Sequence, residues 1–431
     1  MTKPQRPGLT KNFKKKIGII GVGYVGLPLA INLSKSFNVI AFDKDKNRIS
    51  ELVNGNDKNN EHSKKQLKKK NLIFSNEYKE LVECNTFIIT LPTPLNKKKL
   101  PDISLVIKAT KALAKIIKKG NLIIYESTFY PGTVDDYLIP ILEKYSKLKC
   151  NEDFFVGYSP ERINPGDKIH TFSNVTKVIS GSNKKSLKKV KNIYQKVIKA
   201  GVFESSTIKA AELSKILENT QRFINIALMN QISTLCNKMN IDTKEVIDIA
   251  STKWNFHRFY PGYVGGHCVA VDPLYLTYKQ KKLGLSSKFI DAAEKVNSSK
   301  HYEVVKVITK KFKNLKKFKL LILGITFKEN CPDLRNSGSL NLIKSLNKLK
   351  ISPYIHDPYL TKKDLNNMKK HKFKFLSKIN QNNYDCIILS VAHDYYKKLN
   401  ITKIKNLSKN KNCLIFDLKS IFKKDSVNYQ M

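Results

Sequence analysis

Short apolar runs alternate with amphipathic stretches along the first part of the chain. The run Ile17–Ile20 has the length of a buried strand, and a glycine-rich turn and a helix from about Tyr24 to Lys35 follow it. A second run, Asn38–Phe42, ends directly before Asp43 and completes a βαβ unit. Because further apolar runs recur with helical stretches between them, we predict a parallel, doubly wound sheet. These runs are Thr86–Leu91, Leu122–Glu126 and Phe154–Tyr158.

The pattern changes from Thr207 to Asn240, which reads as one long helix with apolar residues at helical spacing. A helix of this length with one apolar side is typical of a contact between domains or between subunits. A second helix is predicted to begin near Asp242 and Thr243, which are good capping residues. The apolar positions of the long helix are Leu213, Ile216, Leu217, Phe223, Ala227, Leu228, Leu235 and Met239.

The βα rhythm restarts in the last third, with the segments KLLILGITF, SLNLIKSLNKL, ISPYIHDP, YDCIILSVA and NCLIFDLK. Its first βα turn begins at Gly324 and lacks a glycine fingerprint, so this domain is predicted to bind something other than a dinucleotide. The chain is therefore expected to be α/β, with two Rossmann-like doubly wound domains joined by a long central helix. The expected boundaries are a disordered lead-in at 1–14, the first domain at 15–205, a central helical domain at 206–310, and the second α/β domain at 311–431.

Bulk properties narrow the class of protein. No apolar run approaches the roughly 20 residues of a membrane span, and the basic N-terminal segment lacks the apolar core of a secretory signal. A cytoplasmic protein is therefore expected. The seven cysteines show no metal-ligand spacing, and their odd number favours reduced thiols, most of them buried. No metal site is predicted.

A formal net charge of +44 suggests a nucleic-acid partner at first sight. The basic residues, however, are nearly all lysines, and they are spread along the whole chain. A dedicated binding surface would favour arginine interleaved with aromatic residues. A solvated lysine-rich surface is the better interpretation, with a positive field that steers anionic substrates inward.

A dinucleotide-binding fingerprint lies in the first βαβ unit. Gly21, Gly23 and Gly26 fit G-x-G-x-x-G between a strand and a helix, and Asp43 ends the next strand. These glycines permit the tight turn, the approach of the pyrophosphate and close helix packing. The carboxylate of Asp43 would bind the ribose hydroxyls and repel a 2′-phosphate, which favours NAD, although Arg48 nearby leaves NADP open.

A second candidate site is the loop Gly265-Gly266-His267-Cys268, followed by Asp272. A cysteine after two glycines has little crowding and suits a nucleophile. A buried loop thiol remains an equal alternative, and a zinc site formed with His267 lacks a second pair of ligands.

A third candidate site lies on the long helix, where Lys215, Asn219 and Arg222 share one face at i, i+4 and i+7. Such a polar stripe is either a solvated face or the wall of an active site. The spacing alone favours the solvated face.

Seven motifs in this order resemble the UDP-glucose/GDP-mannose dehydrogenase family over nearly the whole chain. They are GVGYVGLPLA, LPTP at Leu91–Pro94, EST at Glu126–Thr128, SPERINPG at Ser159–Gly166, KxxxNTxR on the long helix, PGYVGGHC and FKENCPDLRNS. The resemblance implies an N-terminal NAD-binding domain, a helical dimerisation core, a C-terminal domain that holds the uridine nucleotide, and a homodimer.

The resemblance also implies roles for individual residues. The catalytic set is Cys268 as nucleophile, Lys215 and Asn219 as donors to the reacting oxygen, and Asp272 and Thr128 around a water, with Glu161 nearby. The cofactor set is Gly21, Val22, Gly23, Tyr24, Val25, Gly26, Asp43, Arg48, Thr93, Thr128 and Arg335. The substrate set is Glu161, Arg162, Ile163, Lys215, Asn219, Arg222, Gly262, Gly265, Lys328 and Lys419, of which the last two would hold UDP.

The implied reaction is an NAD-dependent, four-electron oxidation of the C6 hydroxyl of a UDP-sugar through a thiohemiacetal and a thioester on Cys268. The segment Pro160–Gly166 lacks the phenylalanine typical of UDP-glucose enzymes and resembles the N-acetylhexosamine branch, GlcNAc or GalNAc, which serves surface polysaccharides such as capsule or O-antigen. The loop departs from many relatives at Tyr260, where a basic residue is common. The alternatives are a UDP-glucose or UDP-N-acetylmannosamine 6-dehydrogenase, a catalytically silent UDP-sugar-binding protein, and a nucleic-acid binder.

Overall fold

The computed structural model describes residues 15–58, 61–162, 169–312, 315, 318–368, 370–381 and 383–431. The chain divides into two compact units. The first runs to Glu218 and includes Leu274–Lys282, and the second comprises Asn219–Pro273 and Leu283–Met431. The boundary therefore falls inside the long helix, and the predicted three-domain division stays a prediction.

The first unit alternates strands and helices as predicted. The strand runs Ile17–Ile20 and Asn38–Phe42 are confirmed to within one residue, whereas the first helix begins at Gly26 rather than near Tyr24. Its strands are β1 (Lys16–Ile20), β2 (Asn38–Phe42), β3 (Leu72–Ser75), β4 (Thr86–Ile89), β5 (Leu122–Tyr125), β6 (Phe155–Tyr158), β7 (Lys177–Gly181) and β8 (Val202–Glu204). Its helices are α1 (Gly26–Leu33), α2 (Lys46–Val53), α3 (Lys64–Leu67), α4 (Ser104–Ala114), α5 (Ile139–Ser146) and α6 (Lys184–Tyr194), with a 3-10 helix at Tyr78–Glu83 and a π-helical turn at Val134–Leu138.

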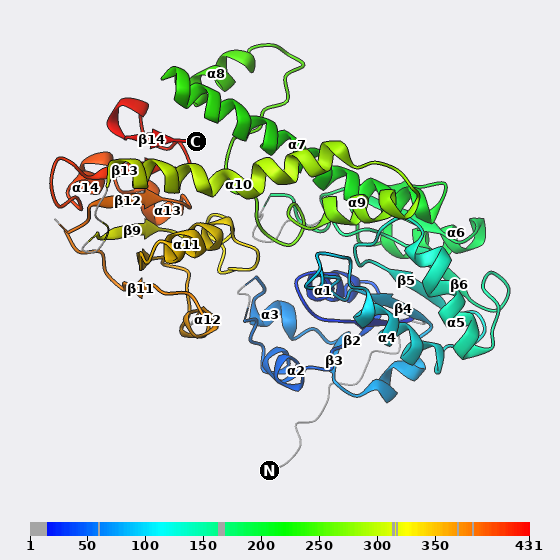
Figure 1. Ribbon diagram of the computed structural model, residues 1–431. Helices are drawn as coiled ribbons and strands as arrows, with labels where there is room; N and C mark the ends of the chain where they lie inside the picture. The colour runs from blue at the N-terminus through cyan, green and yellow to red at the C-terminus, as the bar shows by residue number, and fades with distance from the viewer. Residues whose placement is uncertain are drawn as a thin grey trace. The chain divides into compact units, whose positions relative to one another are not determined.

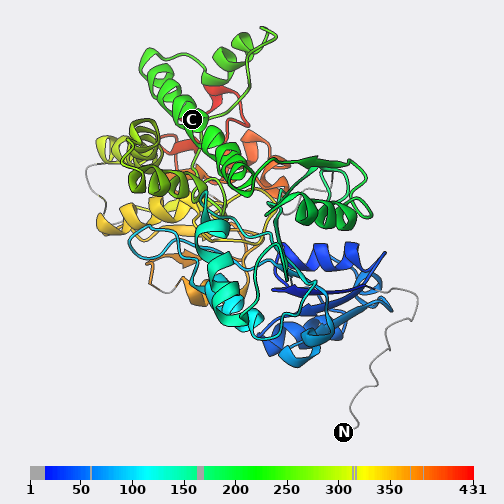
Figure 2. The same cartoon turned by 90° about the vertical axis from the view of Figure 1, so that its right-hand side faces the viewer.

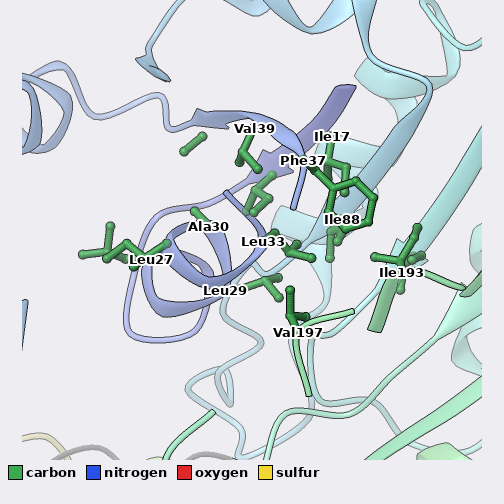
Figure 3. Close-up of a cluster of buried hydrophobic side chains, with 14 of the residues drawn as sticks. Ile17, Leu27, Leu29, Ala30, Leu33, Phe37, Val39, Ile88, Ile193 and Val197 are labelled. Atoms are coloured by element: carbon green, nitrogen blue, oxygen red, sulfur yellow. The ribbon is translucent and has the colours of Figure 1, made fainter. Parts of the chain in front are cut away.

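These strands form one sheet in the order β3-β2-β1-β4-β5-β6-β7-β8. Every pair is parallel except β6 and β7, which run antiparallel, so the predicted all-parallel sheet needs a correction at this junction. Apolar side chains on alternate positions of the strands fill a core on each face, and Figure 2 shows helices on both sides of the blue strands. In Figure 3, side chains of α1 such as Leu29 and Leu33 lie against strand residues Ile17 and Ile88.

The second unit begins within the long helix, which is confirmed as α7 (Ile208–Met239). Asp242 caps the next helix, as predicted, by accepting the backbone N–H of Lys244. The other helices of this unit are α8 (Thr243–Ala250), α10 (Lys288–Lys311), α11 (Gly338–Lys348), α12 (Lys362–Asn367), α13 (Asp394–Lys397) and α14 (Ile401–Lys405), with a 3-10 helix at Lys424–Ser426. The intervening helix α9 (Asp272–Lys282) belongs to the first unit from Leu274 on. The strands are β9 (Leu320–Leu323), β10 (Tyr354–His356), β11 (Lys374–Phe375), β12 (Cys386–Leu389), β13 (Leu414–Asp417) and β14 (Tyr429–Gln430).

The second sheet is all-parallel in the order β11-β10-β9-β12-β13-β14, which repeats the β3-β2-β1-β4-β5-β6 order of the first. The predicted Rossmann-like character of both halves is therefore confirmed. In the second unit α10 runs beside α7 (Figure 1), since Asn297 donates to the Phe223 carbonyl and Lys300 donates to the Asn230 carbonyl. Among the described residues, no helix has both the length and the apolar character needed to cross a membrane.

The apolar side of α7 is only partly buried. Ile216, Phe223 and Ala227 are buried, whereas other members of the predicted apolar set stay exposed. The exposed members are Leu213, Leu217, Leu228, Leu235 and Met239. A helix that leaves this much apolar surface uncovered within one chain has the character of an interface helix.

Candidate active site

The glycine turn after β1 has the geometry that the fingerprint requires. Gly21 adopts a φ of 99°, which L side chains rarely adopt, and a Cβ on Gly26 would lie 1.8 Å from the Gly21 carbonyl oxygen. A Cβ on Gly23 would meet nothing within 4 Å, so open space lies beside its backbone. A turn with two obligatory glycines and one open position fits the approach of a dinucleotide pyrophosphate to the start of α1. Val22, Tyr24 and Val25 complete this turn.

Asp43 follows β2 and is half-buried beside the glycine turn. Its Oδ2 accepts the Val22 N–H at 3.0 Å, and its Oδ1 accepts the Asp45 N–H at 3.0 Å. Arg48 is buried, lies 3.0 Å from Asp57 and donates to the Val22 carbonyl. Arg48 thus stabilises the turn, and Asp57 neutralises its charge. Asp43 remains as the charged group at the end of β2, where the ribose of the cofactor would bind. A negative charge at this position agrees with a preference for NAD.

The loops that follow β4 and β5 are tied together. Thr93 Oγ1 donates to the Thr128 carbonyl at 2.8 Å, and Ser127 Oγ donates to the Leu91 carbonyl at 2.6 Å. The structure therefore places Thr93 and Thr128 side by side. Tyr275, which the sequence did not single out, donates to the Thr93 carbonyl at 2.5 Å and holds this pair.

A buried carboxylate fixes the chain beyond Thr128. Glu212 of α7 accepts the Gly132 N–H at 2.6 Å and the Val134 N–H at 3.0 Å. Burial raises the pKa of Glu212 to about 8. The segment after β5 is thereby anchored to the helix that also carries Lys215.

Glu161 and Arg162 follow β6. The Glu161 carboxylate accepts the Arg162 N–H at 2.6 Å and lies 3.1 Å from Lys177 Nζ. The Arg162 guanidinium lies 2.7 Å from Glu218 and donates to the Thr176 carbonyl. Lys177 is a partner that the sequence did not reveal. Ile163, predicted to line the sugar site, lies outside the described residues.

The glycine loop presents Cys268 as an exposed thiol directly before α9. Its carbonyl accepts the N–H groups of Val271 and Asp272 at 2.9 and 2.8 Å, so Cys268 forms the turn that begins this helix. The alternative of a buried loop thiol is wrong for this residue. By contrast, five other cysteines are buried, as predicted; they are Cys84, Cys236, Cys331, Cys386 and Cys413.

Asn219 and Asp272 are brought together in the second unit. Asn219 Nδ2 donates to Asp272 Oδ2 at 2.6 Å, and both side chains are buried. Lys215, one turn earlier on α7, is buried as well. The solvated-face interpretation is therefore wrong for Lys215 and Asn219, whereas Arg222 is exposed as that interpretation expects.

The glycine loop packs against the segment after β9. A Cβ on Gly265 would lie 2.7 Å from the Asn336 carbonyl, and Gly266 has a φ of 83°. Asn336 Nδ2 donates to the Gly266 carbonyl at 3.0 Å. Further back, Gly262 exchanges two hydrogen bonds with Asn230 of α7, at 2.9 and 3.0 Å. Both glycines of the loop are thus required by close approach or by backbone conformation.

His267 and Arg335 share one carboxylate. His267 Nε2 lies 3.2 Å from Asp333, and Arg335 donates to both oxygens of Asp333. Burial alone would raise the pKa of Asp333, but these hydrogen bonds hold it well below its usual value. Among the described residues, no group of three or more His, Cys, Asp or Glu side chains could hold a metal ion. The predicted contact of Arg335 with NAD stays a prediction.

Lys328 and Lys419 lie in loops at the carboxyl edge of the second sheet, after β9 and β13. Lys419 Nζ is 2.8 Å from Glu329, so an ion pair joins the two loops. Lys328 Nζ lies 5.5 Å from the centre of the Phe327 ring. Two lysines at the carboxyl ends of parallel strands suit a diphosphate, since ligands of such sheets bind at this edge.

A buried histidine that the sequence did not reveal fixes the first of these loops. His393 Nδ1 accepts the Asn330 N–H at 2.9 Å, so its Nε2 carries the proton towards Asp357 at 3.2 Å. Asp357 also accepts the N–H groups of Ile325 and Thr326 at 2.7 and 3.1 Å. Burial opposes ionisation of Asp357, but the hydrogen bond from His393 and those from the backbone lower its pKa.

Comparison with known families gives three consecutive matches. Residues 15–198 match the NAD binding domain of the UDP-glucose/GDP-mannose dehydrogenase family. Residues 209–299 match the central domain of that family, and residues 321–424 match its UDP binding domain. The three matches appear in the family's order and together span most of the chain.

Individual relatives agree with these matches. The chain is 42% identical to UDP-N-acetyl-D-glucosamine 6-dehydrogenase of Salmonella typhi, over 94% of this chain and 96% of that protein. It is 41% identical to UDP-N-acetyl-D-glucosamine 6-dehydrogenase of Pseudomonas aeruginosa, over 96% and 99%. Among solved structures, UDP-D-ManNAc dehydrogenase from Pyrococcus horikoshii superposes with a TM-score of 0.86 at 26% identity, covering 95% of this chain and 96% of that one.

Proposed function

The chain belongs to the UDP-glucose/GDP-mannose dehydrogenase family, and we propose that it oxidises the C6 hydroxyl of UDP-N-acetylglucosamine or its galacto epimer to a carboxylate. It is an NAD-dependent oxidoreductase acting on a UDP-sugar. The observation that carries the proposal is the exposed Cys268 thiol, held on an obligatory glycine loop next to the Asn219–Asp272 pair of the same unit.

Each residue of this group has a chemical task in the proposed reaction. NAD held at the glycine turn supplies the hydride acceptor. The Cys268 thiolate adds to the C6 aldehyde, and the resulting oxyanion needs hydrogen-bond donors. Asn219 keeps one amide N–H after its bond to Asp272, and Lys215 offers its ammonium group from the preceding turn of α7. Covalent attachment to Cys268 keeps the aldehyde from being released between the two oxidations.

The last step, hydrolysis of the thioester, needs a positioned water and a base. Asp272 is held by Asn219, and Thr128 is held by its contact with Thr93. Glu161 is mostly buried and carries a second carboxylate. We assign these three residues to the hydrolytic step, with Lys328 and Lys419 assigned to the diphosphate.

Two observations support N-acetylglucosamine or its galacto epimer as the sugar. The relatives named for UDP-N-acetyl-D-glucosamine share 41 to 42% of their residues with this chain, whereas a relative named for UDP-N-acetyl-D-mannosamine, from Methanococcus maripaludis, shares 32%. The segment Pro160–Gly166 also has the pattern of the N-acetylhexosamine branch. The product would be a uronic acid for surface polysaccharide, and the exposed apolar residues of α7 suit a homodimer.

A panel of nucleotide-sugars tests this proposal. The purified chain with NAD is expected to form NADH with UDP-N-acetylglucosamine or its galacto epimer at a kcat/KM at least about tenfold above those for UDP-glucose and UDP-N-acetylmannosamine. NADH formation that favours UDP-N-acetylmannosamine would contradict the proposed sugar. The absence of NADH with every UDP-sugar would contradict the activity itself.

A further inference from the structure

A buried lysine lies between two carboxylates in the first unit. Lys177, on β7, lies 2.9 Å from Glu126 and 3.1 Å from Glu161, and its side chain is 4% exposed. Glu126 follows β5 and its side chain is fully buried, whereas Glu161 follows β6 and is 10% exposed. The Lys177 ammonium group thus joins the fully buried carboxylate of Glu126 to the partly exposed carboxylate of Glu161.

Aromatic side chains close the inner end of this link. The Tyr194 hydroxyl of α6 donates to the second oxygen of Glu126, and the rings of Tyr194 and Phe172 lie 5.5 and 5.6 Å from Lys177 Nζ. Desolvated rings strengthen the hold on a cation. Lys177 is therefore held by both carboxylates and by these rings, and of the two carboxylates Glu161 is the one with exposed surface.

The net charge of this cluster depends on whether Glu126 is protonated. Burial raises the pKa of Glu126 to about 7, even though Lys177 acts in the opposite direction. Burial opposes the charge on Lys177, but the two carboxylates prevail and raise its pKa. Burial thus favours the protonated form of Glu126, whereas the two carboxylates favour the charged form of Lys177. When Glu126 is ionised, it neutralises part of the field of Lys177. When Glu126 is protonated, Lys177 stabilises the ionised form of Glu161 more strongly.

We propose that Lys177 is a positioning residue for Glu161, and that Glu126 sets how strongly Lys177 holds the ionised form of Glu161. This inference rests on the proposed function, in which Glu161 serves the hydrolytic step. The Arg162 N–H also donates to Glu161, and the Arg162 guanidinium lies beside Glu218. The Arg162 guanidinium is already bound to Glu218 and to the Thr176 carbonyl, so it is not placed to take over the role of Lys177.

The variants Glu126→Gln and Lys177→Met test the proposal by shifting turnover along the pH axis in opposite directions. Glu126→Gln keeps the shape but removes a negative charge near Glu161, so the ionised form of Glu161 becomes easier to reach. The acid limb of kcat should move to lower pH by roughly one unit.

Lys177→Met removes the cation, so the acid limb should move to higher pH and kcat at neutral pH should fall about tenfold or more. Lys177→Arg should restore most of the wild-type profile, since it keeps the charge.

The control is Lys191→Met on α6, which removes a surface lysine paired with Glu204 and should leave the profile unchanged. KM for NAD should stay the same in all variants.

If Lys177 were purely structural, its replacement would lower the melting temperature and leave the pH profile of kcat unshifted. If wild type is active and Glu126→Gln keeps the wild-type acid limb, this inference is wrong and the proposed function stands. If wild type forms no NADH with any UDP-sugar, both are wrong. Should Lys177→Met fail to fold, the Glu126→Gln shift alone decides.

Discussion

At the scale of single residues, two aspartates occupy equivalent positions and do different work. Asp43 ends β2 and Asp357 ends β10, and each accepts an N–H from the turn after the first strand of its sheet. Asp357 is buried and gives its Oδ2 to His393 as well. Asp43 is half-buried and has lone pairs left for the ribose of a dinucleotide. The aspartate at this position of the fold thus serves the protein's own hydrogen bonds in the second unit (Asp357). In the first unit we expect it to bind a ligand (Asp43).

Changing Asp43→Asn separates its charge from its shape. The amide oxygen can still accept the Val22 N–H, but the charged acceptor for the ribose is lost, at a cost of about 1–3 kcal/mol. KM for NAD should rise about tenfold, and discrimination against NADP should fall because the repulsion of a 2′-phosphate is gone. Steady-state kinetics with both cofactors measure this, with Asp153→Asn, which lies outside the glycine turn, as control. An unchanged KM for NAD would contradict the assignment of the glycine turn.

The glycines, Asp43 and Cys268 could be singled out from the sequence. The tight turns before α1 and before Cys268 require glycine, and this requirement is visible in the residue types. It could not predict that Lys215 and Asn219 are buried, since their spacing alone fits a solvated face equally well. Lys177 gave no signal either, because its two partners lie 51 and 16 residues away in the chain. Such partners become visible only when the sheet order is known.

At the scale of elements, one loop of the second unit depends on a histidine far along the chain. His393 accepts the Asn330 N–H and donates to Asp357, which holds the N–H groups of Ile325 and Thr326. The two ends of the loop that carries Lys328 are therefore fixed by one buried pair. This anchoring orders the loop before a nucleotide binds, which lowers the entropic cost of binding.

The variant His393→Phe removes the hydrogen bonds with Asn330 and Asp357, and the contact with the Thr326 hydroxyl, while keeping an aromatic ring of similar size. KM for the UDP-sugar should rise about tenfold, in keeping with the loss of a buried hydrogen bond, while KM for NAD and kcat stay close to wild type. Titration of UDP by calorimetry should show the same loss without turnover. His371→Phe, outside this network, is the control. A rise in KM for NAD alone would contradict the assignment of this loop to UDP.

Elements with unbroken apolar runs were predictable, and elements that need tertiary partners were not. The runs of β1 and β2 were predicted to within a residue because both strands are buried on both faces. β7 was missed, since its sequence KVISG begins with a lysine whose burial depends on its distant partners Glu126 and Glu161. No local pattern in the sequence indicates its antiparallel pairing with β6.

At the scale of the whole molecule, the two sheets share one strand order and differ in what their first turns offer. The first turn is glycine-rich, whereas the second is closed by Asp357 and His393 with two lysines at the carboxyl edge. The repeated βα rhythm made this duplication predictable from the sequence. From the net charge of +44 we expect a positive field that attracts an anionic cofactor and an anionic substrate alike. Raising the salt concentration should therefore weaken the encounter with both.

The ratio of NADH formed to UDP-sugar consumed tests the central claim most directly. The reaction is run to completion with limiting UDP-N-acetylhexosamine and excess NAD, and Cys268→Ser is measured beside the wild type. Oxidation of an alcohol to an acid removes two hydrides, so wild type should give two NADH per sugar and a uronic acid. Cys268→Ser should still bind both ligands and lose steady turnover, because a serine hydroxyl does not ionise near neutral pH. One NADH per sugar with free aldehyde as the product, or near wild-type turnover of Cys268→Ser, would contradict the account.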